Sequence, residues 1–139
     1  MKMEKLQAPL ALLARLMLVF IFVIEGWGKI GNYAGTQEYM ASHGVPGALL
    51  PLVILTELGA GLFVAFGLLT RLAALALAGF CVLAAVFFHH DLADANEFMQ
   101  FTKDIAIAGG FLALVAFGAG EWSIDALWGR QRSGVPISR

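Results

Sequence analysis

The chain has 139 residues, of which 60% are hydrophobic and 14% are charged, little more than half the ~25% that is usual in soluble domains. A mean hydropathy of +0.81 indicates more apolar surface than a soluble domain of this size can bury, so the expected surroundings are a lipid bilayer. The net charge of −1 argues against a nucleic-acid partner, and the single cysteine, Cys81, excludes an intrachain disulfide and a cysteine-based metal site.

Four apolar segments are long enough to be membrane-spanning helices. The first is expected to be retained rather than removed as a signal peptide, because Arg15 interrupts it and no small-residue cleavage site follows. A tight turn at Thr70-Arg71 separates the second segment from the third. The predicted spans are residues 6–28, 47–69, 72–88 and 103–119.

Polar segments join these spans. Residues 36–44 are predicted to form a short helix at the level of the headgroups, with Thr36 as its N-cap. Residues 89–102 are polar and acidic and are expected to form a loop. The chain is thus divided into one membrane domain over residues 1–129 and a mobile tail over residues 130–139.

Basic residues indicate the orientation of the bundle. They gather at the N-terminus, at Arg71 and in the tail, whereas the opposite ends of the spans hold only Lys29 and Lys103. The positive-inside rule therefore predicts that both termini are cytoplasmic. The expected fold class is all-α integral membrane, an antiparallel four-helix transmembrane bundle with both termini inside. Small residues that share one face of the third span are expected to pack against the other helices: Ala74, Ala78, Cys81 and Ala85.

Two charges lie inside the predicted spans, where a charged side chain costs about 2.5–3.5 kcal/mol on insertion scales. Taking residues 6 and 69 as the cytoplasmic ends puts Arg15 about 13.5 Å deep and Glu57 about 18 Å deep. An arginine side chain covers that difference, so an Arg15–Glu57 ion pair is a hypothesis. Three readings stay open: a pair that only fixes helix register, a role for Glu57 in proton or ligand handling, and snorkelling of Arg15 to the interface.

A second group of ionisable residues gathers at the outer mouth of the bundle. By helical periodicity, Lys29, His89 and Lys103 fall on inward faces above Glu57. Two ammonium groups at one site attract an anion or the head group of a quinone, so these four residues are candidate ligand-binding residues. The alternative is that the lysines snorkel and the histidine is solvated. No catalytic residue is identified, and no metal site is expected, because the adjacent His89 and His90 point about 100° apart on a helix.

Several motifs follow one another along the chain: GWGKI ends the first span, LPLVILTELGAGL and FGLLTR follow, FTKDIAIAGGF opens the fourth span, and SID stands at residues 123–125. In this order, over roughly residues 8–128, they resemble the DoxX family of small four-helix membrane proteins. Where that family often has Lys-Asn, this chain has Lys103-Asp104, and the added carboxylate weakens an anion site. The family pattern points to Arg15, Lys29, Glu57, Arg71, Lys103 and Asp125.

The resemblance implies a place in the bacterial inner membrane and a link to redox complexes, because the family takes its name from a subunit of a thiosulfate:quinone oxidoreductase. The function expected from it is that of a membrane subunit of such a complex, at most oxidoreductase-associated. A quinone is the candidate cofactor, and a redox protein or a second copy of the chain is the candidate partner. Two alternatives stay open: a small-molecule transporter, and a structural or assembly factor without chemistry of its own.

Overall fold

The computed structural model describes residues 3–134, which are helical apart from turns and short links. Four segments are long and apolar enough to cross a membrane, as the hydropathy predicts: Glu4–Gly31, Gly47–Phe66, Thr70–Phe88 and Ala95–Phe117. The elements in chain order are α1 (Glu4–Gly31), α2 (Tyr33–Ser42), the 3₁₀ turn η1 (Gly47–Leu49), α3 (Leu50–Ile54), the π-helical turn η2 (Leu55–Ala60), α4 (Gly61–Phe66), α5 (Thr70–Phe88), α6 (Ala95–Phe117) and α7 (Ile124–Ser133).

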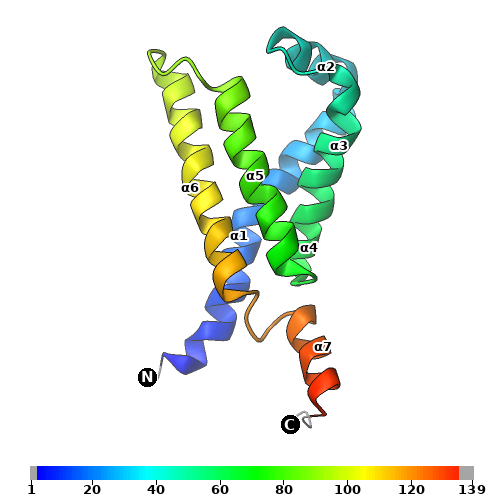
Figure 1. Cartoon of the computed structure of the whole chain (residues 1–139), viewed down its shortest axis with the longest axis vertical. Coiled ribbons are helices and arrows are strands. Elements are labelled where there is room, and N and C mark those ends of the chain that lie inside the picture. The colour runs from blue at the N-terminus through cyan, green and yellow to red at the C-terminus, as the bar shows by residue number, and fades with distance from the viewer. Residues whose placement is uncertain (1–2, 135–139) are drawn as a thin grey trace.

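The four long segments run alternately up and down the molecule in Figure 1. α1 rises behind the others, the α3–α4 segment descends, α5 rises, and α6 descends toward α7. The short helix α2 and the link between α5 and α6 lie at the upper end, which we call the α2 end. The start of α1 and all of α7 lie at the lower end, the α7 end.

Small and aromatic side chains from α1, α4, α5 and α6 form the core. The predicted small-residue face of the third span is confirmed, because all four of its residues are buried. These small side chains leave room for Phe22, whose ring packs edge-on against that of Phe111 with 5.5 Å between centroids. α5 and α6 make the most extensive contact in the bundle.

The start of α6 differs from the sequence prediction. The helix begins at Ala95, so the loop expected over residues 89–102 is wrong from residue 95 onward. The Asp94 carboxylate accepts the backbone N–H groups of Asn96 and Glu97 and caps the helix. The polar composition of these first turns hid them from a hydropathy reading, although Asp94 followed by Glu97 is the spacing of a capping box.

Two other boundaries also differ. α4 ends at Phe66, and the turn consists of residues 67–69, in which Gly67 and Leu69 have left-handed φ values of 69° and 46°. Thr70 and Arg71, predicted as the turn, instead form the first turn of α5. Thr36 does not cap α2, since its hydroxyl lies within the helix and donates to the Asn32 carbonyl.

The predicted tail begins inside a helix. Residue 130, its expected start, belongs to α7, which continues to Ser133. Residues 135–139 lie outside the described residues, so the mobility of the tail and the domain boundary at residue 129 stay predictions.

Gly26 sets how closely α1 approaches the second span. A Cβ atom at this position would lie 2.8 Å from Leu58 Cγ, closer than Cβ atoms in packed cores come, and 3.2 Å from Glu57 Cβ, closer than most of them come. Gly26 is therefore the point at which α1 and η2 lie against each other.

Replacement of Gly26 by alanine is expected to push α1 and η2 apart and to lower the free energy of unfolding by about 1–3 kcal/mol. Gly28→Ala is the matched control, because nothing lies within 4 Å of a Cβ there and alanine favours a helix. Unfolding in mixed detergent micelles measures both variants. Equal stability of the two would contradict the close contact at Gly26.

Candidate functional site

A buried ion pair joins α1 to the second span near the α2 end. Lys29 Nζ donates to Glu57 Oε1 at 2.9 Å, and Glu57 is only 3% exposed. Lys29 also lies 3.4 Å from Oε2 of Glu25, one turn earlier on α1, whose side chain is 57% exposed. The lysine therefore lies between two carboxylates, one buried in the bundle and one at its surface.

Glu57 has unused hydrogen-bonding capacity. It lies in η2, the single π-helical turn of the described chain, and such turns often occur at functional sites. Its second carboxylate oxygen, Oε2, is buried and accepts no hydrogen bond from any described residue. A buried acceptor without a donor is costly, so this oxygen is a place where a bound group could supply a proton or an N–H.

The other predicted ligand-binding residues have separate partners. His89 ends α5, and its Nε2 lies 4.0 Å from Oδ2 of Asp104 on α6. Lys103 is exposed and donates to Gln100, one turn earlier on the same helix. The structure thus brings Lys29 and Glu57 into contact, but it does not bring the whole predicted set onto one site.

The predicted Arg15–Glu57 ion pair is not formed. The Arg15 guanidinium donates instead to the carbonyl oxygens of Val64, at 3.4 Å, and Trp122. The error lay in aligning the ends of the two spans. Gly26 is the residue of α1 that faces Glu57, and it is about 16 Å from Arg15 along the helix at ~1.5 Å per residue.

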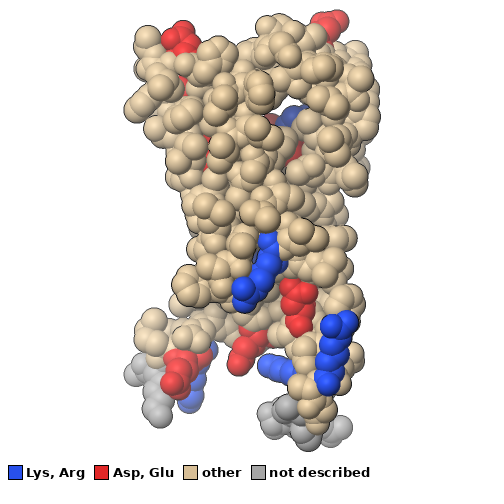
Figure 2. Space-filling model, viewed as in Figure 1, with Lys and Arg blue, Asp and Glu red and all other residues tan. Residues whose placement is uncertain are grey.

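An opening leads toward charged groups in the upper part of the molecule. Figure 2 shows it between the α5–α6 pair and the segment from α2 to α3, with basic and acidic side chains visible inside. Helix α2 covers this end, because the Tyr39 ring stacks on Phe88 of α5 with 5.5 Å between the ring centroids. The His43 ring lies tilted against the same tyrosine at 4.4 Å. The pKa of the Tyr39 hydroxyl is raised, chiefly by burial and further by Glu97, and Lys29 offsets only part of this rise. The hydroxyl is therefore protonated at neutral pH and can donate a hydrogen bond.

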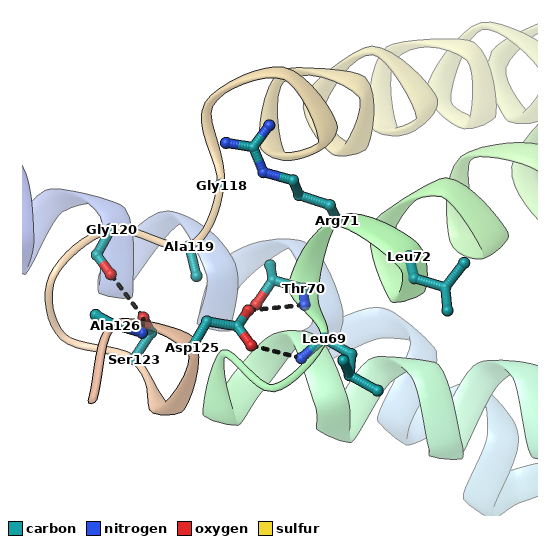
Figure 3. A pocket seen from close by; sticks show the side chains of 10 residues that line it. All are labelled: Leu69, Thr70, Arg71, Leu72, Gly118, Ala119, Gly120, Ser123, Asp125 and Ala126. Atoms are coloured by element: carbon teal, nitrogen blue, oxygen red, sulfur yellow. Dashed lines mark hydrogen bonds between the residues drawn. The ribbon is translucent and has the colours of Figure 1, made fainter. Parts of the chain in front are cut away.

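A second polar cluster lies at the α7 end. A pocket of about 490 Å³ lies between the turn into α5, the link from α6 and the start of α7 (Figure 3). The Asp125 carboxylate accepts the backbone N–H groups of Leu69 at 2.8 Å and Thr70 at 2.9 Å, and so caps α5. Arg71 Nη1 donates to the carbonyls of Val115 and Ala116, each at 3.1 Å, near the end of α6.

Reasoning from the residues alone did not predict the roles of Arg71 and Asp125, which entered only through the family resemblance. Asp125 caps a helix that begins 55 positions earlier, and no local pattern marks such a contact. The start of α7 did carry a signal, because Ser123 accepts the N–H of Ala126 as an N-cap.

Removal of Lys29 tests the buried pair. Lys29→Met leaves the Glu57 carboxylate without a counter-charge, and such losses typically cost about 3–5 kcal/mol of unfolding free energy. The double variant with Glu57→Gln is expected to recover much of the loss, and Glu25→Gln is the exposed control. Unfolding titrations measure the wild type, Lys29→Met, Glu57→Gln, the double variant and Glu25→Gln. Losses in the double variant that equal the sum of the two single losses would argue against the pair.

Removal of the Asp125 carboxylate tests the cap. Asp125→Ala leaves two N–H groups at the start of α5 without acceptors, and loss of such a cap costs about 1–2 kcal/mol. Glu121→Ala is the matched control, because Glu121 is exposed on the same link and makes no described hydrogen bond. Thermal unfolding in micelles compares the two, and similar losses would show that Asp125 does not cap the helix.

Known proteins are similar to this chain over most of its length. Residues 10–90 match the DoxX family. The chain is 50% identical over 125 residues to inner membrane protein YqjF of Escherichia coli strain K12, which covers 90% of this chain and 96% of the relative. It is 36% identical over 123 residues to inner membrane protein YphA of the same organism, covering 84% and 88%.

No solved structure matches the chain. The predicted family resemblance is confirmed by both the family match and the identity to YqjF. With its four apolar helices, the chain is a multi-pass inner-membrane protein that belongs to the DoxX family.

Proposed function

We propose that this DoxX-family protein is the membrane subunit of a redox complex and binds a quinone beside the Lys29–Glu57 pair. The observation that carries the proposal is the buried pair with one carboxylate oxygen unused. Lys29 can donate to a quinone carbonyl, and Glu57 Oε2 can accept from the hydroxyl of the reduced quinol. The same two side chains would therefore suit both redox states of the ligand.

The charges around the lysine favour a neutral quinone over the small anion. Lys29 lies between Glu25 and Glu57, and His89 lies near Asp104. These carboxylates offset the basic groups, so an anion would meet little net positive charge. A quinone carbonyl needs only a directed donor, which Lys29 provides.

An apolar groove supplies a place for the hydrocarbon tail of such a ligand. It has a volume of about 520 Å³ and runs between the second span and α5. Thr56, the neighbour of Glu57 in sequence, lines it, as do Leu52, Gly79 and Phe87. A groove of this apolar lining suits an isoprenoid chain. Neither Lys29 nor Glu57 lines it, so the proposal requires the head group to extend past Thr56 to the pair.

The test is binding of a short-tailed ubiquinone to the full chain in nanodiscs, measured by equilibrium dialysis. We expect saturable binding that weakens at least tenfold, about 1.4 kcal/mol, in Lys29→Gln and in Glu57→Gln. Glu25→Gln is the control and is expected to bind within twofold of the wild type. Equal affinity of Lys29→Gln and the wild type would contradict the proposal.

We also propose that the α7 end faces the cytoplasm and the α2 end faces the opposite side. Lys5, Arg71, Arg130 and Arg132 belong to elements at the α7 end, and cytoplasmic segments carry an excess of such residues. In Figure 2 the charged side chains on the visible face gather mostly in the lower part of the molecule.

Single cysteines test this orientation, since the native Cys81 is buried. An impermeant thiol reagent added to intact cells is expected to label Ser42→Cys in α2 and to miss Ser133→Cys in α7 until the membrane is opened. Labelling of Ser133→Cys in intact cells would reverse the assignment.

A further inference from the structure

The pocket at the α7 end offers a cationic group whose hydrogen bonds are only partly used. Arg71 Nη1 is occupied by two carbonyls of α6, while Nε and Nη2 make no hydrogen bond to any described residue. These two nitrogens form one edge of the guanidinium, with parallel N–H groups that match two oxygens of a phosphate or carboxylate. The helix contact therefore fixes the guanidinium and leaves its bidentate edge free.

Gly118 keeps the space beside this edge clear. A Cβ atom on Gly118 would lie 3.4 Å from Arg71 Nη2 and 3.5 Å from Nε, in the position that an incoming oxygen would approach. Gly118 also has a φ of 80°, which residues other than glycine rarely adopt. A glycine at this position therefore allows both the backbone turn and the open space beside Arg71.

Thr70 adds a second group without a partner. It lines the same pocket, is only 1% exposed, and its hydroxyl makes no hydrogen bond to any described residue. A buried hydroxyl in this state indicates that a hydrogen-bonding group is missing from its surroundings. The nearby Asp125 carboxylate accepts two backbone N–H groups at the positive end of α5 and makes no hydrogen bond with this hydroxyl.

The surroundings of the pocket indicate what kind of molecule carries the phosphate. Leu69 and Leu72 line the pocket and are 51% and 67% exposed, so it opens toward the apolar surface of the spans. Trp122 and Trp128 are half exposed in the neighbouring link and in α7, as in the aromatic belts at the membrane interface. A ligand here has a polar head beside Arg71 and apolar chains beside the leucines.

From this geometry we infer that the pocket at the α7 end binds the phosphate of a phospholipid headgroup on the bidentate edge of Arg71. The acyl chains of that lipid lie along Leu69 and Leu72. This site is at the opposite end of the bundle from the Lys29–Glu57 pair, so it does not depend on the quinone proposal.

Native mass spectrometry of the full chain in mild detergent tests the inference. The protein is titrated with phosphatidylglycerol and, separately, with diacylglycerol that has the same acyl chains and no phosphate. We expect saturable binding of one phosphatidylglycerol and at least fivefold weaker binding of diacylglycerol. Equal binding of the two lipids would overturn the inference, because the phosphate would then contribute nothing.

Substitutions locate the site. Arg71→Lys keeps the positive charge but loses the paired edge, and we expect it to weaken phosphatidylglycerol binding at least fivefold. Arg132→Lys makes the same change on the exposed end of α7, away from the pocket, and is expected to bind as the wild type does. Equal affinity of these two variants would overturn the inference. Thr70→Val, which keeps the side-chain shape, provides a second measurement and is expected to weaken binding at least twofold.

Inorganic phosphate distinguishes the two sources of the same chemistry. If the headgroup of a lipid is the ligand, phosphate in the millimolar range leaves phosphatidylglycerol bound. Displacement of the lipid by phosphate, with phosphate binding that Arg71→Lys abolishes, would overturn the lipid assignment in favour of a soluble phosphate.

Discussion

Gly26 of α1 packs against the π-helical turn η2, and this contact determines which groups the charged side chains of the bundle bond. A carboxylate in the membrane interior is stable only when a donor lies within reach, and this contact places Lys29 on Glu57. The same register places Arg15, near the middle of α1, beside the carbonyls of Val64 and Trp122. The glycine contact therefore sets the surroundings of two buried charges, Arg15 and Glu57, and of the partly buried Lys29.

The two ends of the bundle use their charges differently. At the α7 end, Arg15, Arg71 and Asp125 bond backbone carbonyls and N–H groups, so they mainly hold α1, the turn into α5, α6 and α7 together. At the α2 end, Lys29 and Glu57 bond each other through side chains and leave an acceptor unused. The first arrangement fixes the helix ends and leaves the outer edge of Arg71 and the Thr70 hydroxyl for a ligand, whereas the second leaves a buried carboxylate oxygen beside a lysine, which is why we place the proposed quinone there.

Hydropathy and helical periodicity predicted the four spans and the buried face of α5, because both depend on patterns local to one helix. They failed at the start of α6, where polar side chains continue a helix beyond its apolar part. The pairing of Glu57 was also predicted wrongly, since the relative shift of two helices depends on a close contact at Gly26 that span lengths do not encode. The capping role of Asp125 likewise joins residues far apart in sequence.

The buried carboxylate of Glu57 pairs with Lys29 rather than with Arg15. Solid-state NMR of the labelled protein in bilayers measures it directly, through the ¹⁵N–¹³C dipolar coupling between side-chain nitrogens and Glu57 Cδ. The 2.9 Å distance from Lys29 Nζ to Glu57 Oε1 predicts a strong coupling from Nζ that disappears in Lys29→Gln. A coupling from the Arg15 guanidinium to Glu57 Cδ, with none from Lys29, would contradict the account.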